Sequence, residues 1–113
     1  MVGGEYKLKI AIPKLILFPK RIVTVDLFFL KLTQSYTNKF FISELKEDIK
    51  KNGLLCPLVV SKEKIIIDGN HRYEAMKEDY THAVAYEIDN IEEEDKFFSV
   101  LNSRLWQENK WRQ

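Results

Sequence analysis

Apolar residues alternate with polar ones in several stretches of the chain, and other short runs are rich in β-branched residues. Both patterns are typical of β-strands. The stretches expected to form strands are 6–12, 22–30, 57–61, 64–68 and 82–88. A further apolar run, 15–18, is expected to pair back across Pro13 and Lys14 as a hairpin.

Helical signals separate some of these strands. The segment 42–53 carries Leu45 and Ile49 at a spacing of four residues, with Ser43 as an expected N-cap and Gly53 as its terminator. A second helix is expected from about Arg72 to Glu78. A third is expected to begin near Asn90, with an inner face made of Phe97, Val100, Leu101 and Leu105.

Strands and helices therefore interleave, which predicts an α+β (mixed α/β) fold with a small mixed sheet and about three helices. A length of 113 residues favours a single domain. Within it we expect N-terminal strands over 1–32, a core over 33–90 and a C-terminal helix over 91–113.

Composition narrows the class of protein. Hydrophobic residues make up 45% and charged residues 31%, as in globular proteins, and the formal net charge is only +1. No apolar run reaches the roughly 18 residues that a membrane span needs, so no membrane partner is expected. A single cysteine, Cys56, excludes an internal disulfide framework and favours a cytoplasmic setting.

The stretch IIIDGNHRYEAM, residues 65–76, holds the candidate chemistry. A β-branched run ends at Asp68, and Gly69 allows a positive φ or a close ligand approach. Backbone N–H groups of Asn70, His71 and Arg72 would then open a helix, which predicts a phosphate-binding turn. The alternative is an ordinary turn with a solvated helix start, and the residues alone leave both interpretations open.

The longer stretch LKEDIKKNGLLCPLVVSKEKIIIDGNHRYEAM, residues 45–76, resembles the core of the ParB/sulfiredoxin superfamily. The matching features are a helix ending in Gly53, Pro57 before a strand, and the GNHR turn. ParB proteins bind CTP, sulfiredoxin binds ATP, and a free-serine kinase with a similar turn uses ADP. The resemblance implies that Asp68 and the four GNHR residues bind nucleotide phosphates, with Gly53 and Pro57 shaping the neighbouring wall.

The sequence ENKWR, 108–112, resembles the ENxxR box of ParB proteins. By that resemblance Glu108 would serve hydrolysis, Asn109 would help to hold Mg²⁺, and Arg112 would contact a phosphate. An ordinary solvated helix end is the alternative interpretation.

Two departures from the superfamily limit the activity. Sulfiredoxin places its catalytic cysteine directly after the turn glycine, where this chain has Asn70, so repair of sulfinic acid is not expected. His71 replaces the first arginine of the ParB turn, which leaves the choice between CTP and ATP or ADP open.

The expected function is that of a ParB-like nucleotide-binding domain acting as an accessory or switch in DNA maintenance, partition or regulation. DNA would be contacted directly or through a partner protein, and a homodimer stays open. The alternatives are an enzyme of the same fold, either a ParB-like nuclease or a small-molecule kinase, and a degenerate domain kept for protein interaction.

Overall fold

The sheet is organised around its last strand, β5 (His82–Ile88). In the computed structural model, which describes residues 7–33, 38–89 and 97–101, β5 pairs antiparallel with β2 (Ile22–Asp26) and parallel with both β1 (Ile10–Ala11) and β3 (Leu58–Ser61). β4 (Ile66–Asp68) pairs antiparallel with the outer edge of β3. The expected mixed sheet is confirmed.

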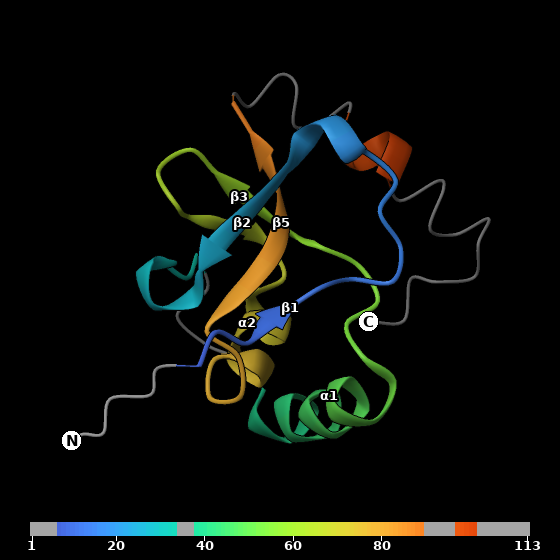
Figure 1. The fold of residues 1–113 in the computed structure, drawn as a ribbon, viewed down its shortest axis with the longest axis vertical. Helices are drawn as coiled ribbons and strands as arrows, with labels where there is room; N and C mark the ends of the chain where they lie inside the picture. Colours follow the sequence, from blue (N-terminus) through green and yellow to red (C-terminus); the bar gives the residue numbers. More distant parts are fainter. Residues whose placement is uncertain (1–6, 34–37, 90–96, 102–113) are drawn as a thin grey trace.

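The pairing register fixes where each strand lies. Ala83 pairs with both β1 and β2, while Ala85 and Tyr86 pair with both β2 and β3. A strand has only two edges, so β2 takes one edge of β5, and β1 and β3 follow each other along the opposite edge. Figure 1 shows β5 crossing the middle of the molecule with β2 beside it.

Two helices cover one face of the sheet. They are α1 (Lys39–Asn52) and α2 (Asn70–Met76), which lie together below the sheet in Figure 1. Alternate strand residues such as Ala83, Ala85 and Val60 point toward these helices and join the same core.

The opposite face carries a second, smaller core. Its buried members are Val59, Tyr86, Ile88, Phe97 and Leu101. Residues 97–101 are helical, so the predicted inner positions Phe97 and Leu101 are confirmed. Val100, expected on the same inner face, is instead 43% exposed.

The expected starts of the first two helices were wrong by two or three residues, whereas the third expected start, near Asn90, lies outside the described residues. α1 begins at Lys39, and the N-cap is Asn38, whose Oδ1 accepts a hydrogen bond from the Phe41 N–H at 3.1 Å, rather than Ser43. α2 begins at Asn70 instead of Arg72, because Gly69 adopts the left-handed conformation that ends β4 abruptly. Gly53 ends α1 as expected.

The N-terminal strands are shorter than the sequence pattern predicts. Of the stretch 6–12, the structure describes residues 7–12, and strand pairing there is confined to Ile10–Ala11; no strand forms at 15–18. The hairpin prediction was wrong because the Lys14 and Leu15 N–H groups donate to the carbonyls of Leu54 and Leu55, at 3.0 and 2.9 Å. The chain there follows the segment after α1 instead of turning back on itself.

The strand expected over 22–30 ends at Asp26. Its Oδ1 accepts a hydrogen bond from the Phe28 N–H at 2.9 Å and so caps a 3-10 turn, η2 (Leu27–Phe29). An earlier 3-10 turn, η1 (Pro19–Arg21), leads into β2. Within the ranges that the structure covers, no helix has the length and apolarity needed to cross a bilayer.

Tyr86 links the second core to the N-terminal segment. Its ring is fully buried, and its hydroxyl oxygen accepts a hydrogen bond from the Leu17 N–H at 2.8 Å. Burial raises the pKa of this hydroxyl above its ordinary value. The folded state therefore holds the proton more tightly than the unfolded state does.

We expect Tyr86→Phe to lower the free energy of unfolding by about 1–2 kcal/mol at about pH 8, since the Leu17 N–H loses its acceptor. The stabilisation from the raised pKa is complete below the unfolded value of about 10 and is lost as the pH rises above it. Urea unfolding of both proteins at about pH 8 and about pH 11 should show the difference between them shrinking. An equal difference at both pH values would contradict this account.

Candidate functional site

The turn between β4 and α2 depends on Gly69 for internal reasons. Its φ and ψ are 109° and 24°, in the left-handed region. A Cβ at this position would lie 2.6 Å from Leu58 Cδ2 and 3.1 Å from Arg72 Nη2. The absent side chain thus faces the interior, so both the backbone conformation and the packing of β3 require glycine. Loss of binding in a Gly69 variant would report disturbed folding as much as a lost ligand contact.

Arg72 is directed into the protein. The residue is only 6% exposed, and its Nη1 donates hydrogen bonds to the carbonyls of Cys56 and Pro57, both at 2.9 Å. Its Nη2 lies 3.3 Å from Oδ2 of Asp68, whose side chain is 55% exposed. A buried charge needs such partners. The guanidinium group therefore ties the segment entering β3 to the first turn of α2, while its role as a phosphate ligand stays a prediction.

Asn70 also has internal partners. Its side chain is buried; Oδ1 accepts a hydrogen bond from the Thr33 N–H at 3.1 Å, and Nδ2 donates to Thr33 Oγ1 at 3.0 Å. The Thr33 hydroxyl in turn donates to the carbonyl of Ile66 at 2.9 Å. These hydrogen bonds hold Thr33 against Asn70 and β4. Its backbone N–H remains relevant to a ligand, because the first α2 bond runs from Tyr73 N–H to the Gly69 carbonyl.

His71 points toward the start of the other helix. Its Nε2 accepts a 3.5 Å hydrogen bond from the Asn38 N–H, and its ring stands edge-on to Phe41 with centroids 5.2 Å apart. Asn38 is the N-cap of α1. The beginning of α1 and the beginning of α2 therefore meet at His71.

The two helices run side by side in the same direction. Beyond their contact at His71, Lys46 of α1 pairs with Glu78 at 2.9 Å, and Lys50 of α1 lies 4.0 Å from Asp79. The hydrogen bond between Lys46 and Glu78 raises the pKa of the lysine and lowers the pKa of the glutamate. Because they run in the same direction and meet at His71, the helices present their N-terminal ends together. Those ends carry partial positive charge and N–H groups ahead of the first helical bonds, which suits an anion.

The remaining predicted residues occupy different places. Pro57 is fully buried beneath the turn, and its carbonyl is one of the two that Arg72 binds. Gly53 lies at the far end of α1, where its φ is 85° and a Cβ would lie 3.3 Å from Lys14 Cε. A helix of 14 residues is about 21 Å long, so the structure does not bring Gly53 to the His71 end.

Glu108 and Asn109, the predicted hydrolysis and Mg²⁺ residues, lie outside the described residues. Their roles stay predictions. Among the residues that the structure describes, no group of three His, Cys, Asp or Glu side chains could hold a metal ion.

Three contributors to this region were missed in the sequence. Asn38 is a polar residue two positions before the apolar pair at 40–41, which is a recognisable N-cap signal. Thr33 and the carbonyl of Cys56 gave no local signal. They reach α2 only through the tertiary fold.

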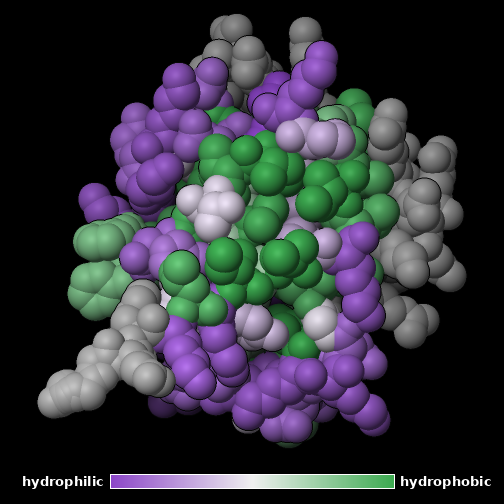
Figure 2. Space-filling model, in the orientation of Figure 1, coloured by the Kyte–Doolittle hydropathy of each residue, from purple (hydrophilic) through white to green (hydrophobic). Residues whose placement is uncertain are grey.

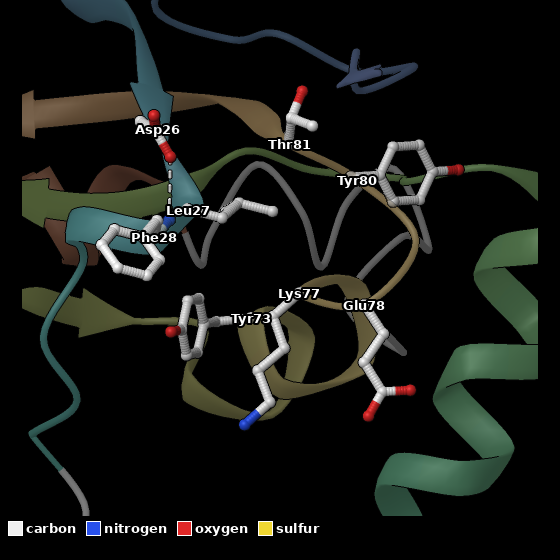
Figure 3. Close-up of a pocket in the computed structure, with 8 residues that line it drawn as sticks. All are labelled: Asp26, Leu27, Phe28, Tyr73, Lys77, Glu78, Tyr80 and Thr81. Atoms are coloured by element: carbon white, nitrogen blue, oxygen red, sulfur yellow. Dashed lines mark hydrogen bonds between the residues drawn. The ribbon is translucent and has the colours of Figure 1, made fainter. Parts of the chain in front are cut away.

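A separate cavity of about 390 Å³ opens beside the C-terminal half of α2 and η2 (Figure 3). Its lining consists of Asp26, Leu27, Phe28, Tyr73, Lys77, Glu78, Tyr80 and Thr81. None of the predicted site residues lines it. Its charged groups already have protein partners: Lys77 pairs with Glu74 at 2.7 Å, and Glu78 pairs with Lys46.

The structural role of Arg72 can be tested directly. We expect Arg72→Ala to lower the free energy of unfolding by about 3 kcal/mol, because two interior carbonyls lose their charged donor. Asp68→Ala removes only the exposed partner and should cost less than about 1 kcal/mol. Denaturant unfolding measures both. A loss below about 0.5 kcal/mol in Arg72→Ala would show that the guanidinium does not hold the turn.

Comparison with solved structures supports the fold. The C2221 form of a Pnob8-like ParB-N domain aligns with a TM-score of 0.51 and 18% identity over 66% of this chain. Sulfiredoxin from Arabidopsis thaliana aligns with a TM-score of 0.54 and 20% identity, covering 67% of this chain and 93% of the sulfiredoxin. At these identities the likeness shows the fold alone. The alignment spans about a third, 32%, of the ParB-N chain.

No curated protein matches this chain. The family model of the ParB N-terminal domain matches residues 30–104, a range that includes α1, the β4–α2 turn and α2. That match covers well over half of the sequence. The chain therefore belongs to the ParB N-terminal domain family.

Proposed function

We propose that this domain binds a nucleotide through its phosphates and acts as an accessory or switch in DNA maintenance, partition or regulation. The observation that carries the proposal is the meeting of two helix N-termini at His71. Oriented N–H groups at such a position favour an anion. The imidazole of His71 lies between the helices and can donate a further hydrogen bond to a phosphate oxygen.

Both helices contribute to this site. α1 has 14 residues and α2 has seven, and each contributes the unpaired N–H groups of its own first turn. The Phe41 N–H is already bound by Asn38, and the Ile42 N–H donates to the Asn38 carbonyl at 3.0 Å. The donors proposed for the phosphate are the N–H groups of Lys39 and Phe40, together with those of residues 70–72.

Family membership supports the same proposal, because the ParB-like proteins whose turn resembles the GNHR sequence bind nucleotides at that turn. Arg72 would act mainly from beneath, by holding the turn in shape. We also propose contact with DNA, either directly or through a partner protein. The base of the nucleotide and the need for Mg²⁺ are left to the titration that follows.

Calorimetric titration with CTP, ATP and ADP, each with and without Mg²⁺, tests the proposal. We expect binding of at least one nucleotide, and we expect His71→Ala to weaken it by about tenfold or more, as for loss of one charge-assisted hydrogen bond. Binding without turnover would favour a switch, whereas phosphate transfer to a small acceptor would identify a kinase.

His82→Ala provides a matched control. This second histidine lies at the start of β5, where Nδ1 is 2.9 Å from Thr81 Oγ1 and Nε2 is 3.8 Å from Asp26. Its loss should leave nucleotide affinity unchanged. Failure of all three nucleotides to bind, or equal weakening by the two histidine variants, would overturn the proposed site.

A further inference from the structure

β2 lies at an edge of the sheet. It pairs with β5 along one side, and β5 pairs with β1 and β3 on its own opposite side. Among the residues that the structure describes, no second strand pairs with β2. Its residues, 22–26, keep one register with β5 and include no proline or lysine, which commonly block such edges. A regular edge strand of this kind is open to pairing with a further strand.

One hydrogen bond shows which backbone groups of β2 face outward. The Leu27 N–H donates to the Thr81 carbonyl at 3.0 Å, and this pair continues the register of β2 with β5. Bonded and non-bonded positions alternate along an antiparallel pair, so every second residue before Leu27 also bonds to β5. The N–H and C=O groups of the residues between them, Ile22, Thr24 and Asp26, therefore point away from β5.

Some of these outward groups already belong to the turns at either end of β2. Ile22 is the C-cap of η1 and Asp26 is the N-cap of η2, so the Ile22 N–H and the Asp26 C=O serve those turns. The Ile22 C=O, the Asp26 N–H and both groups of Thr24 have no hydrogen bond from the described part of the chain. The edge thus offers two N–H and two C=O groups to an incoming strand.

A second copy of β2 satisfies all of these groups. When the two strands are antiparallel and Thr24 lies opposite Thr24 of the other copy, these two residues exchange N–H and C=O bonds. Each Asp26 N–H then meets the Ile22 C=O of the other copy. The donors and acceptors of the edge are therefore self-complementary, as a twofold interface requires.

The charges at the ends of β2 are also self-complementary. Lys20 and Arg21 precede the strand and Asp26 ends it. Antiparallel copies place the basic end of each strand beside the acidic end of the other, whereas parallel copies would bring like charges together.

Two exposed aromatic side chains lie next to this edge. Phe28 and Phe29 of η2 are 86% and 64% exposed. Figure 2 shows apolar side chains projecting at the left of the molecule, where η2 follows the arrow of β2 in Figure 1. Because η1 directly precedes β2 and η2 directly follows it, antiparallel pairing sets η2 of one copy beside η1 of the other. The exposed Lys20 of η1 is a cation that suits an aromatic ring there.

We propose that two copies of this chain pair through the outer edges of β2, antiparallel about a twofold axis at Thr24. The two sheets then form one continuous sheet across the interface. The turn that holds His71 follows β4 at the other edge of the sheet, with β3 and β5 between it and β2. The pairing is therefore independent of nucleotide binding at His71.

Two segments of the same chain outside the described residues suit this edge less well. Residues 92–95 are four consecutive acidic residues, which are poor strand formers. The segment 90–96 spans at most about 25 Å, and it must return to Phe97, whose ring lies 5.4 Å from that of Tyr86. It is too short to follow β2 from beyond Ile22 to Asp26 and come back. Residues 102–113 contain no β-branched residue.

Sedimentation velocity of the full chain over a wide range of concentrations tests the pairing, and we expect monomers and dimers in equilibrium. Thr24→Lys places like charges opposite each other, and Thr24→Pro removes an outward N–H without removing a bond to β5. Each should weaken the dimer at least about tenfold. Thr24→Val keeps a β-branched side chain and should dimerise as the unmodified chain does.

A second pair of variants tests the contribution of η2. Phe28→Ser should weaken the dimer, because it removes apolar surface beside the other copy's η1. The matched control is Leu8→Ser, at a residue that is 62% exposed and precedes β1 on the opposite side of β5, and it should leave the dimer unchanged. Circular dichroism of each variant at low concentration checks that the monomer is folded. Thr24→Lys decides the matter if Thr24→Pro does not fold.

Amide hydrogen exchange, followed by NMR, locates the contact. The amides of Thr24 and Asp26 should exchange slowly only at concentrations where the dimer forms. Those of Val23 and Val25 bond to β5 and should be protected at every concentration.

Several results would overturn the pairing. One is a chain that stays monomeric at every concentration, and another is a dimer that Thr24→Lys does not weaken. Equal weakening by Leu8→Ser and Phe28→Ser would place the interface elsewhere. Slow exchange of Thr24 and Asp26 in a monomer would assign the edge to another segment of the same chain.

Discussion

The buried guanidinium of Arg72 is the interaction on which this structure depends. It gathers the carbonyls of Cys56 and Pro57 beneath the first turn of α2. Because a desolvated charge is costly without partners, these bonds oppose any movement of α2 relative to the start of β3. Gly69 complements them, since its missing side chain leaves room for Leu58 and for the guanidinium itself.

The residues of the GNHR turn therefore have two different roles. Asn70 and Arg72 point inward, to Thr33 and to the carbonyls before β3. His71, between them, points to the N-terminal end of α1. A rigid turn of this kind fixes the position of His71 and the neighbouring N–H groups, and such preorganisation is what an anion site needs. The same contact joins the start of α1 to the start of α2.

The sequence predicted most of the second half of the fold because its signals are local. Alternation found β5, glycine marked the ends of α1 and β4, and the order of elements indicated a mixed sheet. Arg72 was different, because an arginine in the first turn of a helix can face solvent or interior, and its carbonyl partners lie 15 and 16 residues earlier. The burial of Ala11 was equally hidden, since it depends on pairing with β5, some 70 residues away.

The central claim is that a nucleotide's phosphates meet the two helix N-termini at His71. Backbone amide NMR shifts, recorded during a nucleotide titration, test it residue by residue. The account predicts the largest changes at Lys39, Phe40, Asn70 and His71, with little change at Tyr80 in the separate cavity. Changes centred on that cavity, with the amides of α1 and of the turn unmoved, would contradict it.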